Sequence, residues 1–328
     1  MPSIKVALLG FGTVGEGIYR ILNERKEEIK RETGCVIDIV SILVRDKAKE
    51  RLATPGTRVT NDIQEVLSNP DIDFIFEAIV GEEPAYTYLS EAIEKGFHVI
   101  TANKTMFAKH GPALLKHAAF RGVHFGYEAT TAGGIPIIRT VTNLLPTDRV
   151  RRIRGVLNGT SNFILTKMRE DGIPFKAALH EAQALGYAEA DPTDDISGKD
   201  AFRKLMILSA LAFGSQPNWQ DVPVVGIDKV TNDDVADASK GKLRYRHVAD
   251  ILIDEKGILH GSVGPVLIGP EHPLYGVDGV NNAIIVETDY LGALTLVGPG
   301  AGMYPTASAM AGDFLQMIGK HEKVLITS

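Results

Sequence analysis

The stretch Val6-Ala-Leu-Leu-Gly-Phe-Gly-Thr-Val-Gly15 places an apolar strand pattern directly before a GxGxxG motif, and a helical pattern follows at once. In this context Gly10 permits a tight turn, Gly12 lets a pyrophosphate approach the backbone, and Gly15 lets strand and helix pack closely. A plain strand-to-helix turn is the alternative. Because strand, motif and helix coincide, we expect a dinucleotide-phosphate site formed by Gly10, Phe11, Gly12, Thr13, Val14 and Gly15.

Short apolar runs alternate with helical patterns through the first part of the chain. The strand candidates are residues 5–9, 36–44, 73–79, 98–101 and 123–127, and the helix candidates are residues 15–30, 84–95 and 113–120. This alternation is typical of a Rossmann-type, doubly wound parallel sheet. We therefore expect an α/β dinucleotide-binding domain over residues 1–134.

The pattern changes after the segment Thr131-Ala-Gly-Gly-Ile-Pro136. Helix candidates follow at residues 137–145, 162–169, 175–185 and 200–213, and strand candidates at residues 150–157, 243–253, 259–266, 283–287 and 294–297. A last helix is predicted over residues 306–318. The sequence thus predicts a second, α+β domain with a mixed sheet over residues 135–302.

Composition and charge favour small-molecule chemistry. The chain has 328 residues, 44% of them hydrophobic, and a net charge of −6, which gives no general attraction to nucleic acid or to an anionic membrane. The longest apolar run, residues 205–213, is about half of what a membrane helix needs. Cys35 is the only cysteine, so a disulfide framework is excluded. The N-terminus enters a strand pattern without a signal peptide, and we expect a cytoplasmic protein.

The end of the second predicted strand bears on the choice of cofactor. An NAD site would place an acidic residue there, whereas this strand ends in Arg45, with Asp46 next. A guanidinium suits a 2′-phosphate and favours NADP(H), while Asp46 keeps NAD(H) open. A solvated loop arginine is the competing interpretation.

Lys104 follows the predicted strand at residues 98–101, at the sheet edge where ligands of open α/β sheets gather. A nicotinamide and its substrate should meet at this edge. The competing interpretation is an ordinary surface lysine.

Residues 186–205, GYAEADPTDDISGKDAFRKL, place Asp200 and Lys204 four residues apart on an otherwise apolar helix. Buried charge on such a face is costly unless it is paired or functional. However, Ser197 and Asp200 also fit a capping box, which would turn the carboxylate back to the backbone and leave Lys204 solvated. The spacing leaves both interpretations open. A lysine with a neighbouring carboxylate could stabilise and protonate the alkoxide formed by hydride transfer to a carbonyl.

Six motifs in order resemble homoserine dehydrogenase, which reduces L-aspartate 4-semialdehyde to L-homoserine with NAD(P)H in threonine, methionine and isoleucine biosynthesis. They are Gly10-Phe-Gly-Thr-Val-Gly15, Thr101-Ala-Asn-Lys104, Glu128-Ala-Thr-Thr-Ala-Gly-Gly-Ile-Pro136, Leu157-Asn-Gly-Thr-Ser-Asn-Phe163, Gly186-Tyr-Ala-Glu-Ala-Asp-Pro192 with Asp200-Ala-Phe-Arg-Lys204, and the glycine-rich run from Gly298 to Ala309. The resemblance runs nearly end to end.

The resemblance implies a role for each matching residue. Lys204 would be the acid/base lysine with Asp200 beside it, and Lys104 would orient the substrate or share the proton transfer. Glu189 would hold the substrate ammonium, helped by Tyr187 and Asp195. Further residues would line the substrate pocket or contact the cofactor: Asn158, Gly159 and Thr160 for the substrate, and Ala102, Lys104 and Gly302 for the cofactor.

The resemblance also implies a Na⁺ or K⁺ site at the hinge between the domains, formed by Glu128 and the carbonyls near Thr131, Gly133 and Ile135. It has the last helix, residues 303–328, return to the first domain, and makes residues 135–302 a substrate-binding domain that forms a homodimer. The sequence shows neither the kinase domain nor the ACT-type module of many relatives, so we expect no threonine inhibition through such a module.

Two other functions compete with this one. A dehydrogenase that oxidises the same semialdehyde to an acyl phosphate needs a cysteine nucleophile, and Cys35 lies away from the cofactor edge. An NADP(H)-binding sensor would not need Lys104, Glu189, Asp200 and Lys204 together. The presence of all four favours an enzyme.

Overall fold

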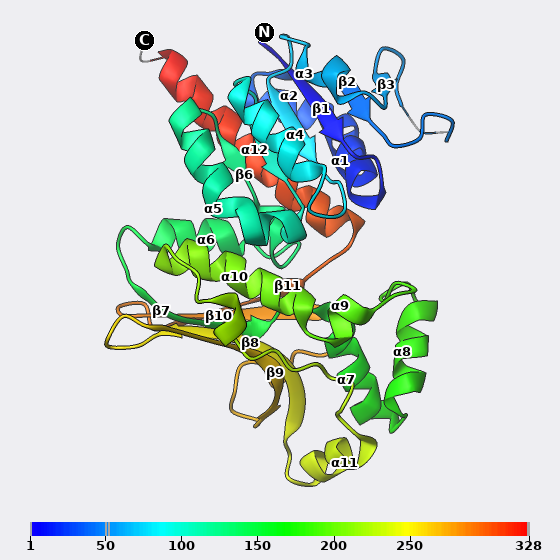
Figure 1. Ribbon diagram of the computed structural model, residues 1–328, viewed down its shortest axis with the longest axis vertical. Coiled ribbons are helices and arrows are strands. Elements are labelled where there is room, and N and C mark those ends of the chain that lie inside the picture. The colour runs from blue at the N-terminus through cyan, green and yellow to red at the C-terminus, as the bar shows by residue number, and fades with distance from the viewer. Residues whose placement is uncertain (1, 50, 52, 327–328) are drawn as a thin grey trace. The chain divides into compact units, whose positions relative to one another are not determined.

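The computed structural model describes residues 2–49, 51 and 53–326 (Figure 1). The chain forms two compact units. The first contains the residues up to Gly134 together with the segment from Gly302 onward, and the second contains Ile135–Ala301. No helix among the described residues is long and apolar enough to cross a membrane.

The first unit is built on a six-stranded parallel sheet in the order β3-β2-β1-β4-β5-β6. This is the strand order of a Rossmann fold, so the predicted fold is confirmed. Only the short edge strand β3 was not predicted, since it has few residues to show a pattern. The strands are β1 (Ser3–Leu9), β2 (Val36–Leu43), β3 (Arg58–Thr60), β4 (Phe74–Glu77), β5 (His98–Thr101) and β6 (Phe125–Gly126).

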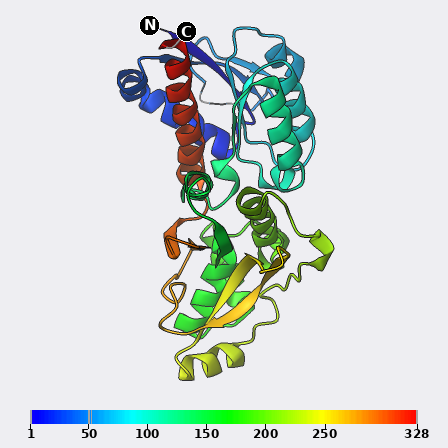
Figure 2. The same cartoon turned by 90° about the vertical axis from the view of Figure 1, so that its left-hand side faces the viewer.

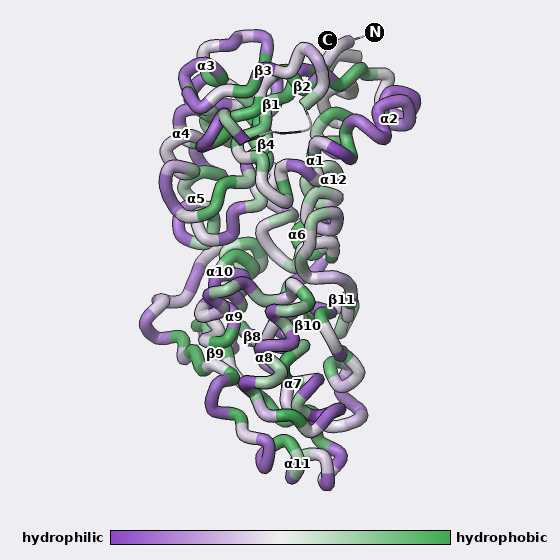
Figure 3. The backbone as a smooth tube through the Cα atoms, turned by 90° about the vertical axis from the view of Figure 1, so that its right-hand side faces the viewer, coloured by the Kyte–Doolittle hydropathy of each residue, from purple (hydrophilic) through white to green (hydrophobic). Residues whose placement is uncertain are grey.

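The helices of the first unit differ from the predicted ones in three places, of which one is the short α3, which was not predicted. The predicted helix at residues 15–30 is two helices, because Arg25 leaves helical geometry between α1 and the hydrophilic α2 (Figure 3). Helix α5 begins at Lys104, well before the predicted residue 113, because burial of Met106 and Phe107 stabilises its first turns despite Pro112. The helices are α1 (Thr13–Glu24), α2 (Lys26–Thr33), α3 (Ile63–Leu67), α4 (Ala85–Glu94), α5 (Lys104–Arg121) and α12 (Met303–Ile326).

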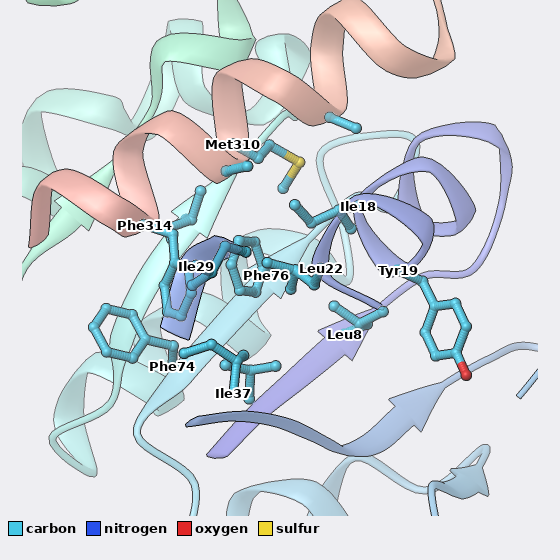
Figure 4. Packing of buried hydrophobic residues seen from close by; sticks show 14 of the residues in the cluster. Leu8, Ile18, Tyr19, Leu22, Ile29, Ile37, Phe74, Phe76, Met310 and Phe314 are labelled. Carbon is cyan, nitrogen blue, oxygen red and sulfur yellow. The ribbon is translucent and has the colours of Figure 1, made fainter. Parts of the chain in front are cut away.

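Helix α12 completes the core of the first unit. Phe314 packs edge-on against Phe74 and Phe76, with ring centroids 4.9 and 5.3 Å apart (Figure 4). Helix α12 also runs beside α1 (Figure 2), where Gly17 allows close approach, since a Cβ there would lie 2.8 Å from Met303 Cγ. The last helix therefore belongs to the Rossmann unit although it is remote in sequence.

The second unit contains a five-stranded sheet in the order β11-β10-β7-β8-β9. The prediction of a mixed sheet was wrong, because all four strand pairings are antiparallel and the parallel pairing at Val224 and Val263 is an isolated bridge. Two tight hairpins, β8–β9 and β10–β11, impose this direction. The strands are β7 (Val150–Val156), β8 (Arg244–Ile253), β9 (Leu259–Ile268), β10 (Asn281–Thr288) and β11 (Ala293–Pro299).

Helices α7 and α10 pack against this sheet and bring their N-terminal ends to the site described below. The long predicted helices are present, whereas the short α9 and α11 were not predicted. The helices of the unit are α6 (Ile137–Leu144), α7 (Gly159–Asp171), α8 (Phe175–Ala184), α9 (Thr193–Ile196), α10 (Lys199–Phe213) and α11 (Asn232–Lys240).

Candidate active site

The glycine loop of the first unit has the geometry that a phosphate needs. Gly10 has a φ of +97°, and a Cβ there would lie 2.7 Å from the Ala78 carbonyl oxygen. A Cβ on Gly15 would lie 2.1 Å from the Gly10 carbonyl oxygen, so α1 could not pack as it does. At Gly12, the N-cap of α1, a Cβ would meet no atom within 4 Å. This open space at a helix N-terminus fits a pyrophosphate.

A pocket of about 550 Å³ extends from the glycine loop to the end of β2. Arg45 lines it, and so does Arg51, which sequence reasoning missed because the segment between them has no regular pattern. Two guanidinium groups thus belong to one pocket with Gly10 and Gly12. The lining residues are Gly10, Phe11, Gly12, Leu43, Val44, Arg45, Arg51, Asn61, Ala78, Ile79, Val80, Pro84 and Tyr88.

Lys104 is the first residue of α5, directly beyond the carboxyl end of β5. The Asn103 side chain caps this helix by accepting a hydrogen bond of 3.0 Å from the Met106 N–H. The Ala102 N–H donates to the Glu77 carbonyl oxygen at 3.0 Å, which fixes the segment to β4. The structure therefore holds the start of α5, and Lys104 with it, at the ligand-binding edge of the sheet.

In the second unit, Lys204 and Asp200 form an ion pair on α10, with 2.8 Å between Nζ and Oδ2. Both side chains are buried, at 8% and 2% exposure. Lys204 also donates to the Leu157 carbonyl oxygen at 2.6 Å, and Asn158 Nδ2 donates to Asp200 Oδ2 at 2.8 Å. Both charged groups of the pair are therefore positioned by the end of β7 and the start of α7.

The alternative capping box at Ser197 is wrong. Helix α10 begins at Lys199 with Gly198 as its N-cap and with no side-chain cap, and the buried Ser197 hydroxyl has no hydrogen-bond partner among the described residues. Gly198 has a φ of +87°, and a Cβ there would lie 3.1 Å from the His247 ring. A left-handed residue thus starts the helix, and the Asp200 carboxylate is directed to Lys204.

The N-terminus of α7 joins several predicted substrate residues. Asn158 caps this helix through a 2.8 Å bond from the Ser161 N–H and also donates to Asp195 Oδ1 at 2.7 Å. The Thr160 hydroxyl donates to the Tyr187 carbonyl oxygen at 2.7 Å. Gly159 packs so closely that a Cβ would lie 2.7 Å from the Val280 carbonyl oxygen. One network therefore contains Asp195, Asp200, Lys204 and the start of α7.

Other side chains of the 186–205 stretch lie outside this network. The Glu189 side chain is exposed and makes no hydrogen bond or ion pair within the described parts of the chain. The Tyr187 ring is half exposed and packs edge-on against Phe163. Asp191 accepts from Thr193, and Asp194 pairs with Arg203. Thus the Asp195 carboxylate is connected to the pair through the Asn158 amide, and Tyr187 contacts α7 through its backbone carbonyl.

The predicted cation residues lie in one short segment. Glu128 is buried and its N–H donates to Asp313 Oδ2 at 2.9 Å. Thr131 is also buried, and Ala132 and Gly133 have positive φ angles of 56° and 52°. Ile135, in the second unit, accepts from the Ile137 N–H at 2.8 Å. A carboxylate and backbone carbonyls are the types of donor that hard cations prefer.

Chemically, the second unit offers a buried ammonium with a fixed direction beside an amide and two carboxylates. Such a desolvated charge pair is typical of a site for acid/base catalysis, although structural pairs also occur. The first unit offers a phosphate cradle and two arginines. Together these features suit hydride transfer between a dinucleotide and a small polar substrate.

Comparisons with known families agree with this chemistry. Residues 10–128 match the family model described as homoserine dehydrogenase, NAD binding domain, and residues 136–315 match the family model described as homoserine dehydrogenase. The two matches cover most of the chain and meet near the boundary between the two compact units.

Individual relatives carry the same name. The chain is 38% identical to homoserine dehydrogenase of Bacillus subtilis (strain 168) over 319 residues, 97% of this chain and 73% of the relative. A homoserine dehydrogenase structure from Thiobacillus denitrificans is 41% identical and has a TM-score of 0.93. The match covers 98% of this chain and 75% of that chain. A hyperthermophilic archaeal homoserine dehydrogenase in complex with NADPH is 29% identical, with a TM-score of 0.82. The match covers 96% of this chain and 97% of that chain. The resemblance seen in the sequence is confirmed, and the chain belongs to the homoserine dehydrogenase family.

Proposed function

We propose that this protein reduces L-aspartate 4-semialdehyde to L-homoserine with NAD(P)H. The observation that carries the proposal is the buried Asp200–Lys204 pair, held by Leu157 and Asn158, in a chain whose family acts by hydride transfer. The alternative of a sensor without catalysis is not supported, because the relatives are named as dehydrogenases.

The bound nicotinamide would supply the hydride that reduces the aldehyde carbon. The protein must then deliver a proton to the carbonyl oxygen, and Lys204 is the proposed donor. Asp200 and the Leu157 carbonyl oxygen direct two of its three N–H bonds, which fixes the ammonium before the substrate binds. Lys204 would regain its proton from solvent after the product leaves. Lys104 is proposed as the second lysine, which orients the substrate or shares the proton transfer.

Selection of the substrate is proposed to rest on the residues around α7. The exposed Glu189 carboxylate is available to the substrate ammonium, with Tyr187 and Asp195 nearby in sequence. Asn158, Gly159 and Thr160 present a helix N-terminus, which favours an anionic group such as the substrate carboxylate. Loss of Glu189 should therefore raise the KM for the semialdehyde more than it lowers kcat.

The decisive experiment follows NADPH consumption with L-aspartate 4-semialdehyde for the native protein and for Lys204→Ala. Turnover by the native protein and a loss of about 10³-fold in kcat in the variant are expected for the removal of a catalytic acid. Absence of turnover by the native protein would refute the proposal. Full activity in the variant would refute the role of Lys204 alone.

We further propose that NADP(H) is favoured over NAD(H). Arg45 and Arg51 line the pocket that begins at the glycine loop, and guanidinium groups bind a 2′-phosphate well. Ala102 and Gly302, which has a φ of +122° and directly precedes α12, are proposed to contact the cofactor too. Arg45→Ala should weaken NADPH binding by about tenfold, the loss of one charge-assisted contact, and leave NADH binding unchanged. Equal losses of affinity for NADPH and NADH would show that Arg45 does not bind the 2′-phosphate.

A monovalent cation and a homodimer are the remaining proposals from the family. The oxygen donors of Glu128, Thr131, Gly133 and Ile135 support the cation, and replacement of Na⁺ and K⁺ by a bulky organic cation should lower activity. The edge strand β9 exposes Val266 and Leu267, which supports association through the second unit. A monomeric mass by light scattering would contradict the dimer.

A further inference from the structure

Glu77 is a fully buried carboxylate for which the reaction proposed above has no role. It ends β4, in the first unit, and its two oxygens contact different donors. Oε1 accepts from the Ile79 N–H at 2.6 Å, and Oε2 accepts a short hydrogen bond from the Thr101 hydroxyl on β5. Glu77 thus bridges the carboxyl ends of two neighbouring strands.

The hydrogen bonds continue from Glu77 into both loops beyond these strands. The Thr101 hydroxyl accepts from the Asn103 N–H at 3.0 Å. Asn103 Nδ2 then donates to the carbonyl oxygens of Ile79 and Gly81, at 2.9 and 2.7 Å, while its Oδ1 caps α5. The same network therefore fixes residues 79–81 and the helix start that carries Lys104.

The loop that Glu77 holds is also a wall of the cofactor pocket. Ala78, Ile79 and Val80 line this pocket together with Gly10 and Gly12. Val80 is 92% exposed, so its conformation is set by the backbone on either side rather than by packing. The loop after β4 consequently depends on the Glu77 network for its position.

Within the part of the chain that the structure describes, Glu77 has no charged partner, which is unusual for a buried carboxylate. Its interactions are with uncharged donors: the Ile79 N–H, Thr101 and Asn103. The charged residues of the following loop have other partners, because Glu82 pairs with Lys109 and His110, and Glu83 accepts from Thr87. Across the sheet Glu77 is aligned with Leu9 and Thr101. Burial raises the pKa of Glu77 to about 7.

We propose that Glu77 is a positioning residue that holds the Ile79–Gly81 loop and the Lys104-bearing start of α5 in the arrangement that binds the cofactor. This inference rests on the proposed function, since it takes the cofactor to lie along the carboxyl edge of the sheet. Glu77 acts through the loops and does not itself touch the substrate.

A dependence on pH follows from the hydrogen-bond chemistry. The ionised carboxylate accepts from both donors, whereas a protonated carboxyl must use one oxygen as a donor. The Ile79 N–H cannot accept, so the carboxyl proton must lie on Oε2 and donate to the remaining lone pair of the Thr101 oxygen, which also accepts from Asn103. Protonation therefore removes the hydrogen bond that Thr101 donates to the charged carboxylate and leaves weaker, uncharged bonds to both loops, so cofactor affinity should fall as the pH drops through neutrality.

The test compares NADPH dissociation constants, from the fluorescence of the bound cofactor, between about pH 6 and about pH 8. For the native protein we expect NADPH binding about tenfold weaker at the lower pH, as for loss of one hydrogen bond to a charged group. Glu77→Gln should lose most of this dependence. The 2′-phosphate of NADPH titrates near pH 6 in both proteins, so it cancels in the comparison.

Variants at Thr101 test the same network and do not depend on whether Glu77→Gln folds. Thr101→Ser keeps the hydroxyl and should retain native affinity, whereas Thr101→Val should weaken NADPH binding about tenfold and lower kcat through Lys104. Glu94→Gln, which changes an exposed carboxylate on α4, is the matched control and should bind like the native protein.

Each outcome decides a different question. Two results would overturn the inference if the native enzyme binds NADPH. One is a pH dependence of NADPH binding in Glu77→Gln equal to that of the native protein, and the other is equal NADPH affinities in the two Thr101 variants. Absence of NADPH binding by the native protein at every pH would overturn the proposed function, and this inference with it.

Discussion

Glu77 and Asp200 are two buried carboxylates, one in each unit, and their surroundings differ in one respect. Asp200 has the Lys204 ammonium 2.8 Å away, whereas the hydrogen-bond donors around Glu77 in the described parts of the chain are uncharged. A paired buried charge is compensated within the fold, while an unpaired one adjusts its protonation instead. The comparison separates a carboxylate that supports a charged catalytic lysine from one whose own charge can change near neutral pH.

The largest effect is expected where the ion pair is broken. Asp200→Asn leaves the buried Lys204 ammonium without its counter-charge, so we expect a loss of about 3 kcal/mol in unfolding free energy. We also expect kcat to fall by about 10²-fold, because the proton donor is no longer held in its charged, directed state. Calorimetry and steady-state kinetics measure the two effects.

A second substitution separates stability from catalysis in this pair. Lys204→Met combined with Asp200→Asn removes both charges, and the double variant should regain stability while activity stays lost. If Asp200→Asn alone were as stable as the native protein, the pair would be poorly desolvated and its contrast with Glu77 would disappear.

Replacement of the Glu77 carboxylate by an amide should have the opposite effect on stability near neutral pH. Burial raises the pKa of Glu77 from 4.5 to about 7, so the contribution of Glu77 to the unfolding free energy is most favourable below pH 4.5 and is lost as the pH rises through 7. The full difference corresponds to about 3 kcal/mol. Glu77→Gln removes this loss, and its stability relative to the native protein should rise between about pH 5 and about pH 8.

Thermal unfolding of both proteins across this pH range measures the difference. The amide group introduced by Glu77→Gln changes the unfolding free energy by an amount that does not depend on pH. This amount cancels, because only the change in stability with pH is compared between the two proteins. If stability changed with pH equally in the native protein and in Glu77→Gln, Glu77 would not titrate in this range.

These two carboxylates also show how far sequence reasoning reached. The i, i+4 spacing predicted that Asp200 and Lys204 share a helix face, but not their burial, which depends on Leu157 and Asn158 from another element. Glu77 was not singled out, because its partner Thr101 lies 24 residues away and no local pattern marks it. The glycine loop was predictable because its turn, phosphate approach and helix packing all depend on neighbouring residues. The direction of β7 in the second sheet was not, since β7 pairs with β8 and β10, which lie far from it in the sequence.

The smallest effect concerns Ser197, whose backbone N–H would have competed with Lys204 for the Asp200 carboxylate in a capping box. Loss of a true N-cap costs about 1 kcal/mol, but the buried Ser197 hydroxyl has no hydrogen-bond partner in the described parts of the chain and Gly198 is the N-cap. Ser197→Ala should therefore change stability by less than about 0.5 kcal/mol and leave kcat unchanged. Thr231→Ala is the matched control, because Thr231 and Asp234 form a capping box on α11, and its loss should cost about 1 kcal/mol. If both variants lost stability equally, Ser197 would be capping α10, and the Asp200 carboxylate would be shared between the helix backbone and Lys204.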